Sequence, residues 1–242
     1  MASSVFLSIT APAYNERENI ETVVTYWESV FAGDNISGEI VIGEDGSTDG
    51  TKDVLAQLQT RFSNLVVVDH AVNRGYGHAL SSAIARSQGD YVLTIDSDGQ
   101  FDASEYRVLM LEMDKGYDIV TGYRRRKQDS LLRVIADRVL NLIIRLLFRL
   151  QLRDTNCALK LFRGDVARRL KIEARGYPTP TELLIRAQTL RYRIGEAGIT
   201  HHERAGGASK LKAFQTSWHM LLFLAYLKYK QVLFRLNVIN DF

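Results

Sequence analysis

Short apolar runs alternate with helix-length segments through the first half of the chain. Runs rich in β-branched residues that end at turn or polar residues predict strands at Val5–Thr10, Glu39–Gly43, Leu65–Asp69 and Asp90–Ile95, and another beginning over Asp118–Thr121. The predicted helices between them are Glu16–Phe31, Thr51–Phe62, Gly77–Ser87 and Ala103–Lys115. This rhythm predicts an α/β fold with a mostly parallel sheet flanked by helices, and such sheets bind ligands outside the carboxyl ends of their strands.

Composition places the chain among ordinary globular proteins. Of its 242 residues, 46% are hydrophobic and 24% are charged, and no internal repeat or low-complexity linker divides it. We therefore expect one domain over residues 1–242. Residues 1–123 would form its first half, and residues 124–242 a second half that completes it. The single Cys157 cannot form an internal disulfide, which favours a reducing compartment such as the cytosol, and Met1–Thr10 lacks the pattern of an export signal.

Charge is distributed unevenly along the chain. Lys and Arg number 31 and Asp and Glu 28, and the resulting net charge of +3 is too small to predict nucleic-acid binding. Residues 124–175 nevertheless contain 15 basic and five acidic side chains, so this stretch is expected to meet an anionic surface or ligand. The longest apolar runs, such as Met220–Leu227, are far shorter than the ~20 residues that span a bilayer, so no transmembrane helix is predicted.

Two carboxylates follow the fourth predicted strand. Asp96 and Asp98 are separated by one residue, so the alternation of a strand directs both side chains to one side, with Gly99 permitting a turn and Gln100 close behind. Two hard oxygen ligands suit Mg²⁺ or Mn²⁺, an ion that also binds water and substrate phosphates. The alternative is a solvated Asp-Gly turn, and the neighbouring loops favour the metal site.

The other strand ends carry polar loops directly before a helix. Residues 12–16 read Pro-Ala-Tyr-Asn-Glu, and residues 44–51 read Glu-Asp-Gly-Ser-Thr-Asp-Gly-Thr. An acid at such a position can accept from a ribose or a base, and Tyr14 can stack on a base; helix capping by Ser47 or Asp49 is the alternative. Residues 73–79, Asn-Arg-Gly-Tyr-Gly-His-Ala, add glycines that permit close backbone approach to a phosphate.

In this order and spacing, the four segments resemble family-2-type glycosyltransferases with the GT-A fold, in which Pro-x-Tyr-Asn-Glu, Asp-Asp-Gly-Ser-x-Asp, Asn-x-Gly-x-Gly-x-Ala and Asp-x-Asp line the nucleotide-sugar site. The resemblance covers Val5–Asp102 and is greatest to dolichyl-phosphate mannose synthase and bacterial polyprenyl-phosphate glycosyltransferases. Glu44 stands where the family usually has Asp. The resemblance implies a nucleotide-sugar site formed by Pro12, Tyr14 and Glu16 near the base, Glu44 near the base or ribose, Asp45, and Asp96, Asp98 and Gln100 around the metal.

The resemblance continues in the second half of the chain, through residues 122–124, 133–141 and 204–210. It implies that Arg204, Ser209 and Lys210 contact the donor diphosphate. Arg124 and Arg133 would hold an acceptor phosphate, since guanidinium groups match phosphate oxygens; a solvated basic surface is the alternative. Glu182 falls where related enzymes carry an acidic active-site segment, and the alternative is a charge that complements a helix N-terminus.

Two segments have the composition of helices that lie at a membrane surface. In Arg138–Arg153 the arginines fall on one helical stripe with Leu, Ile and Phe on the rest. Trp218–Lys230 brings aromatic and basic residues together near the carboxyl terminus. The alternative for both segments is burial in the core or a dimer contact.

These inferences predict an inverting enzyme that transfers a sugar from a nucleotide-diphosphate sugar to polyprenyl (dolichyl or undecaprenyl) phosphate. It would use Mg²⁺ or Mn²⁺ at the cytoplasmic face of a membrane, with Asp98, Arg124, Arg133 and Glu182 as catalytic residues. A membrane-anchoring subunit or a second copy is a further expected partner, and nucleic acid is not. Two alternatives stay open: a soluble glycosyltransferase that activates a hydroxyl acceptor with Glu182 or another acid, and a catalytically silent membrane-surface protein.

Overall fold

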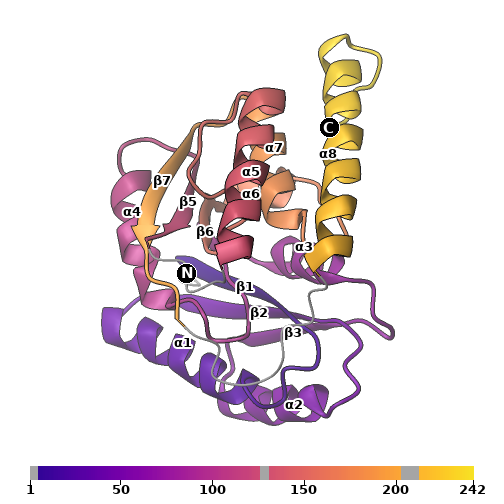
Figure 1. Cartoon of the computed structure of the whole chain (residues 1–242). Coiled ribbons are helices and arrows are strands. Elements are labelled where there is room, and N and C mark those ends of the chain that lie inside the picture. Colours follow the sequence, from indigo (N-terminus) through magenta and orange to yellow (C-terminus); the bar gives the residue numbers. More distant parts are fainter. Residues whose placement is uncertain (1–4, 126–130, 203–212) are drawn as a thin grey trace.

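The apolar runs form the strands of one sheet (Figure 1). The computed structural model describes residues 5–125, 131–202 and 213–242, and for residues 131–137 and 213–217 it describes the backbone alone. The strands are β1 (Leu7–Ala13), β2 (Gly38–Glu44), β3 (Leu65–Asp69), β4 (Tyr91–Thr94), β5 (Ile119–Arg124), β6 (Lys160–Arg163) and β7 (Ile194–Ile199). They pair in the order β3-β2-β1-β4-β6-β5-β7.

The direction of the strands brings the predicted site loops together. β6 is antiparallel to β4 and to β5, and the other strand pairs of the described sheet are parallel. The carboxyl ends of β1, β2, β4 and β5 therefore share one edge of the sheet. The predicted mostly parallel α/β sheet is confirmed. β1 continues three residues beyond the expected Thr10, so that Pro12 pairs with Gly43.

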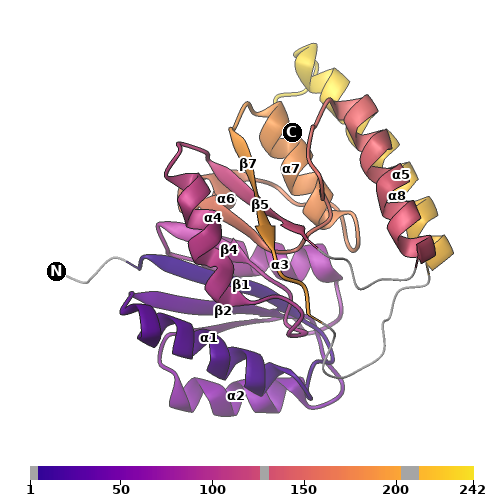
Figure 2. The same cartoon turned by 60° about the vertical axis from the view of Figure 1, so that its left-hand side comes forward.

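Helices cover both faces of the sheet (Figure 2). One face carries α1 (Ile20–Asp34), α2 (Thr51–Arg61) and α4 (Tyr106–Met113), the last preceded by a short 3₁₀ helix, η1, at Ala103–Glu105; the other carries α3 (Tyr76–Arg86), α6 (Gly164–Arg169) and α7 (Thr179–Thr189). A hydrophobic core lies on each face of the sheet, and successive residues of a strand contribute to opposite cores. Leu93 belongs to the core that includes α1 and α4, whereas Val92 belongs to the core that includes α3 and α7.

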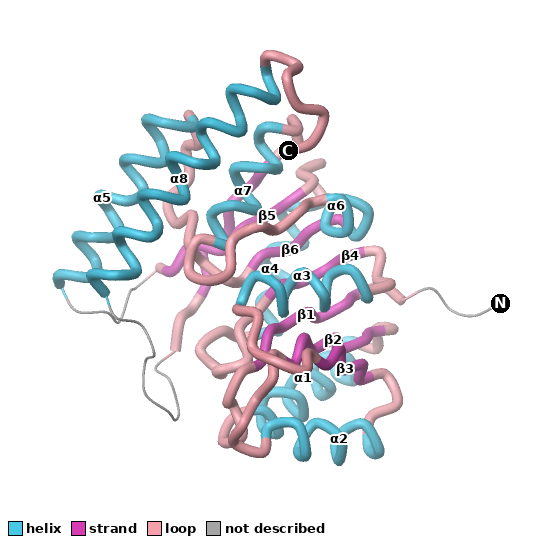
Figure 3. The backbone as a smooth tube through the Cα atoms, turned by 90° about the vertical axis from the view of Figure 1, so that its right-hand side faces the viewer, coloured by secondary structure: helices cyan, strands magenta, loops and turns pink. Residues whose placement is uncertain are grey.

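Two longer helices, α5 (Leu131–Phe148) and α8 (Ala213–Arg235), lie side by side, away from α1 and α2 (Figures 1 and 3). Ile144 and Phe148 of α5 join the core that Met220 and Leu224 of α8 complete. The helix expected over Arg138–Arg153 is wrong at its end, because α5 stops at Phe148, Arg149 adopts a φ of 59°, and the following Leu150 and Leu152 are buried. No described helix is both long and apolar enough to span a bilayer.

A close approach of α3 to the sheet explains one glycine of β2. A Cβ atom at Gly43 would lie 2.1 Å from the carbonyl oxygen of Ala79. We predict that Gly43→Ala lowers the free energy of unfolding by about 1–3 kcal/mol through overpacking, measured by denaturant unfolding.

Gly33→Ala is the matched control, since a Cβ at that position of α1 has no neighbour within 4 Å. This substitution is expected to leave stability unchanged or to raise it by about 0.4–1 kcal/mol. Equal unfolding midpoints for Gly43→Ala and the unmodified chain would contradict the packing argument.

Candidate active site

A cavity of about 420 Å³ opens at the shared carboxyl edge of β1, β2 and β4. Its walls combine polar loop residues with the start of α3. The lining residues are Pro12, Ala13, Tyr14, Glu16, Asp45, Asn73, Gly75, Tyr76, Ala79, Asp96, Ser97 and Asp98. Six of the residues that the sequence motifs predicted for nucleotide-sugar or metal binding therefore surround one space: Pro12, Tyr14, Glu16, Asp45, Asp96 and Asp98.

The neighbouring acids Glu44 and Asp45 have different positions. The Glu44 carboxylate is fully buried and accepts hydrogen bonds from the backbone N–H groups of Gly46 (3.1 Å) and Ser47 (2.7 Å), so it shapes its own loop. Asp45 lines the cavity and accepts from the N–H groups of Arg74 (2.9 Å) and Gly75 (2.8 Å). Asp45 thus joins the end of β2 to the loop before α3.

The two carboxylates of the Asp-x-Asp segment lie together in the cavity wall. The Tyr76 hydroxyl donates a hydrogen bond to Oδ1 of Asp96 (2.8 Å), and Asp98 accepts from the N–H of Gln100 (3.1 Å). Burial, followed by the Asp98 charge, raises the pKa of Asp96 to about 7. Burial also raises the pKa of Tyr76 well above its usual value, so the phenol keeps its proton and remains the donor.

This acidic pair fits a divalent cation. The mutual repulsion of Asp96 and Asp98 would be relieved by a positive ion between them, and carboxylate oxygens are the ligands that Mg²⁺ and Mn²⁺ prefer. Within the described ranges no cluster of three His, Cys, Asp or Glu side chains could hold a metal. Two protein carboxylates are sufficient for an ion whose other ligands are water and substrate phosphates.

Gln100 connects this loop to the segment after β7. Its side-chain amide donates to the carbonyl of His202 (3.2 Å), and the His202 N–H donates to the Gln100 carbonyl (2.8 Å). The predicted diphosphate ligands Arg204, Ser209 and Lys210 lie outside the described residues, although Arg204 is only two positions beyond His202. The side chain of Arg133 also lies outside the described part, while its backbone belongs to α5.

Residues 173–176 pack against the glycine-containing segment at the start of α3. A Cβ at Gly75, whose φ is +98°, would lie 2.3 Å from the Arg175 carbonyl oxygen, and one at Gly77 would lie 1.8 Å from the Ala174 oxygen. The Gly77 N–H donates to the Arg175 carbonyl (3.3 Å). Glycine at both positions is therefore explained by protein packing as well as by any approach to phosphate.

Glu182 lies behind this contact and is absent from the residues that line the cavity. Its fully buried carboxylate accepts from the N–H groups of Glu173 (3.0 Å) and Ala174 (2.8 Å) and pairs with Nε of Arg186 (2.8 Å). Burial raises the pKa of Glu182, and the Arg186 charge opposes that shift. These contacts are typical of a residue that holds a chain segment in place.

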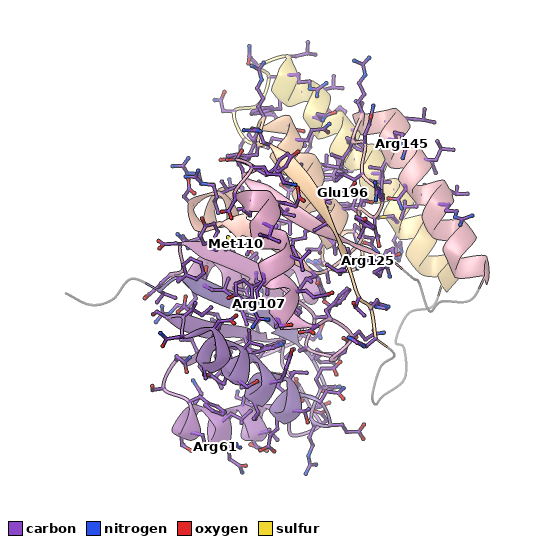
Figure 4. The ribbon with its side chains drawn as sticks, turned by 90° about the vertical axis from the view of Figure 1, so that its left-hand side faces the viewer. Arg61, Arg107, Met110, Arg125, Arg145 and Glu196 are labelled. Atoms are coloured by element: carbon purple, nitrogen blue, oxygen red, sulfur yellow. The ribbon has the colours of Figure 1, made fainter. Side chains whose placement is uncertain are left out.

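A second cavity, also of about 420 Å³, is lined by arginines. Its lining residues are Arg124, Arg125, Arg138, Asn141, Leu142, Arg145 and Arg153. Arg124 is the last residue of β5 and forms a forked pair with Asp154, from Nε to Oδ2 (2.7 Å) and from Nη2 to Oδ1 (3.2 Å). Figure 4 labels Arg125 and Arg145 in the same half of the molecule, with Arg61 of α2 at the opposite end.

Comparison with known proteins agrees with this architecture. The family model described as "Glycosyl transferase family 2" matches residues 8–170. The chain belongs to this family. The predicted family and the GT-A fold are thereby confirmed. Residues 8–170 contain the acidic pair, Asp96 and Asp98, and also Arg124 of the arginine-lined cavity.

Two curated relatives are transferases named for the lipid phosphate undecaprenyl phosphate. The undecaprenyl-phosphate 4-deoxy-4-formamido-L-arabinose transferase of Edwardsiella ictaluri (strain 93-146) is 31% identical over 209 residues, 85% of this chain and 62% of its own length. The enzyme of the same name from Salmonella choleraesuis (strain SC-B67) is 27% identical, with 84% and 62% covered. The chain therefore spans less than two thirds of the length of these relatives.

Solved structures share the fold at low sequence identity. Glucosyl-3-phosphoglycerate synthase from Mycobacterium tuberculosis, in complex with Mn²⁺, uridine diphosphate and glucosyl-3-phosphoglycerate, superimposes with a TM-score of 0.70 at 20% identity, covering 94% of this chain and 80% of its own. Mannosyl-3-phosphoglycerate synthase from Rubrobacter xylanophilus gives 0.70 at 14% identity, covering 98% and 76%. At these identities the likeness concerns the fold.

Sequence reasoning missed several residues of this family 2 site. The sequence motif indicates only the glycines on either side of Tyr76, because the close packing that holds this segment involves residues 174 and 175, about 100 positions away. Asp154 carried no local signal, because its partner Arg124 is 30 residues away in the sequence. The helical pattern predicts a membrane-facing stripe that includes Arg145 and Arg153, and in the structure both line the arginine-lined cavity.

The contacts of Glu182 generate a prediction about stability. We expect Glu182→Gln to lower the free energy of unfolding by about 1–3 kcal/mol, because it removes the charged acceptor of the buried Arg186 Nε–H and leaves the partly exposed Glu173 (3.1 Å) as the remaining countercharge. Denaturant unfolding measures the effect, and Glu182→Gln/Arg186→Met should recover part of the loss. Unchanged unfolding together with abolished turnover would instead assign Glu182 the role of a general base.

Proposed function

We propose that this chain transfers a sugar from a nucleotide-diphosphate sugar to the phosphate of a polyprenol, such as undecaprenyl or dolichyl phosphate, with inversion at the anomeric carbon. Membership of glycosyl transferase family 2 supports the reaction class. The curated relatives are undecaprenyl-phosphate sugar transferases, which supports the lipid-phosphate acceptor, even though the chain spans 62% of their length.

The observation that carries the proposal is the presence of two cavities of opposite charge at one sheet edge. β4 and β5 run in the same direction because both are antiparallel to β6, so their carboxyl ends are on the same side. Asp96 follows β4 within two residues, and Arg124 ends β5. An acidic, metal-compatible donor site and a cationic acceptor site next to it suit transfer between a nucleotide sugar and a second phosphate.

Four residues that line the first cavity have a role in holding the donor. Tyr14 offers a ring for stacking on a base, and Asp45 keeps the loop before α3 in place. Asp96 and Asp98 would hold Mg²⁺ or Mn²⁺ against the donor diphosphate. When bound, such an ion neutralises the charge that develops on the leaving diphosphate.

The arginine-lined cavity would hold the acceptor. A phosphomonoester has a second pKa near 6, so at neutral pH it is largely dianionic and nucleophilic. Arginines that orient it can therefore replace a general base, and its attack opposite the leaving diphosphate inverts the anomeric carbon. The burial of Glu182 disfavours the alternative in which this residue activates a hydroxyl acceptor.

The helix beside this cavity suits the surface of a membrane. Val139, Leu142 and Leu146 of α5 are exposed (51%, 53% and 73%) and follow one another at helical spacing. Arg138 and Arg145 lie next to them around the helix, which gives the apolar stripe a basic border. We propose that this face meets the cytoplasmic side of the membrane, where the isoprenoid tail of the acceptor remains.

A transfer assay tests the proposal as a whole. A panel of nucleotide sugars is incubated with Mn²⁺ and undecaprenyl phosphate in anionic vesicles, and glycosylated lipid is detected by mass spectrometry. We expect product from the unmodified chain, none from Asp98→Ala, and the protein in the vesicle pellet. Equal product with and without metal would overturn the metal site, and protein confined to the supernatant would overturn the membrane contact.

The arginine-lined cavity gives a separate prediction. Arg138→Ala/Arg145→Ala should raise KM for undecaprenyl phosphate at least tenfold, since one charge-assisted contact contributes about 1.5–3 kcal/mol. The dissociation constant of the nucleotide sugar, measured by calorimetry, should change less than twofold. Arg61→Ala, in an exposed pair with Glu21 on the opposite side of the molecule, controls for loss of positive charge. If the affinity for the nucleotide sugar fell as much as the affinity for undecaprenyl phosphate, these arginines would belong to the donor site.

A further inference from the structure

The Tyr76 hydroxyl contacts one of the two carboxylates of the acidic pair and has no assigned role. It donates to Oδ1 of Asp96 over 2.8 Å, from the first residue of α3 to the loop after β4. Both residues line the first cavity. The hydrogen bond therefore links the start of α3 to the loop that carries the proposed metal ligands.

The structure holds Tyr76 in place from several directions. On its N-terminal side, the N–H of Gly75 donates to the carboxylate of Asp45 (2.8 Å). On its C-terminal side, the N–H of Gly77 donates to the carbonyl of Arg175 (3.3 Å). The Tyr76 ring packs against the hydrophobic core to which α3 and α7 contribute. With its backbone and ring both held, the hydroxyl has little freedom to follow a moving carboxylate.

We propose that Tyr76 is a positioning residue for metal binding, which engages Oδ1 of Asp96 and presents Oδ2 of the same carboxylate to the divalent cation. This inference rests on the metal-dependent transfer proposed above. A carboxylate fixed by a hydrogen bond loses less rotational freedom when it binds a metal, and substitution of such outer partners lowers metal affinity by 10- to 100-fold.

The same hydrogen bond helps the two acids to coexist. Asp96 and Asp98 repel each other, and a phenol that donates to Asp96 stabilises its ionised form. Asp98 receives a corresponding hydrogen bond from the backbone N–H of Gln100. In each carboxylate of the pair, an oxygen thus accepts a hydrogen bond from the protein. Asp96 accepts from a side chain, and Asp98 accepts from the main chain.

Tyr76→Phe removes the hydroxyl and keeps the ring in its packing site. We expect the Mn²⁺ dissociation constant, measured by the electron paramagnetic resonance signal of free Mn²⁺, to rise at least tenfold, with an unchanged thermal unfolding midpoint. Tyr106→Phe is the matched control, because Tyr106 donates to the carboxylate of Asp34 (2.6 Å) at the end of α1, outside both cavities. Its Mn²⁺ affinity should equal that of the unmodified chain.

A double-mutant cycle separates positioning from general loss of structure. On an Asp96→Asn background, Tyr76→Phe should cause no further loss of Mn²⁺ affinity, because the hydroxyl acts through the Asp96 carboxylate. Tight Mn²⁺ binding by Tyr76→Phe, within twofold of the unmodified chain, or additive losses in the cycle overturn the inference alone. Failure of the unmodified chain to bind Mn²⁺ overturns the metal site of the proposed function and this inference with it.

Discussion

The contact between the start of α3 and the carbonyl groups of residues 174 and 175 is the constraint on which the site depends. Gly75 and Gly77 approach these carbonyls so closely that any side chain would displace them. Segments about 100 residues apart in sequence are thereby pressed together. Because Glu182 accepts hydrogen bonds from residues 173 and 174, the second half of the chain sets the position of a loop in the first.

This contact also determines the positions of the side chains that line the cavity. The first residue of α3, Tyr76, engages Asp96, while Asp45 holds the loop before α3 from the end of β2. The site is therefore built from three strand ends and one distant segment, each contacting the next. Preorganisation of this kind reduces the entropy that a metal or a diphosphate must lose on binding.

A buried lysine lies between the two cavities. Lys160 of β6 is fully buried, donates to the carbonyl of Cys157, and interacts electrostatically with Asp154 and Asp96. Burial lowers the pKa of Lys160 to about 8, and burial raises the pKa of the Cys157 thiol to about 12, so the single cysteine is a protonated core residue. A charge on Lys160 would stabilise the ionised carboxylates on both sides of β6.

The sequence alone determined the order of the first five strands and the four helices between them, the family, and the placement of acids at strand ends, because β-branched apolar runs and the turn residues that end them are local properties of the chain. The sequence patterns did not predict β7 or β6, which inserts antiparallel between β4 and β5. Only the tertiary structure decided which of these acids lines the cavity and which is enclosed by the protein. Glu44 and Asp45 are adjacent, yet one is enclosed by its own loop and the other faces the cavity. Glu182 carries the sequence signal of an active-site acid, and packing places it behind the site. The pairing of Tyr76 with Asp96 depends on contacts between distant segments, which no local pattern encodes.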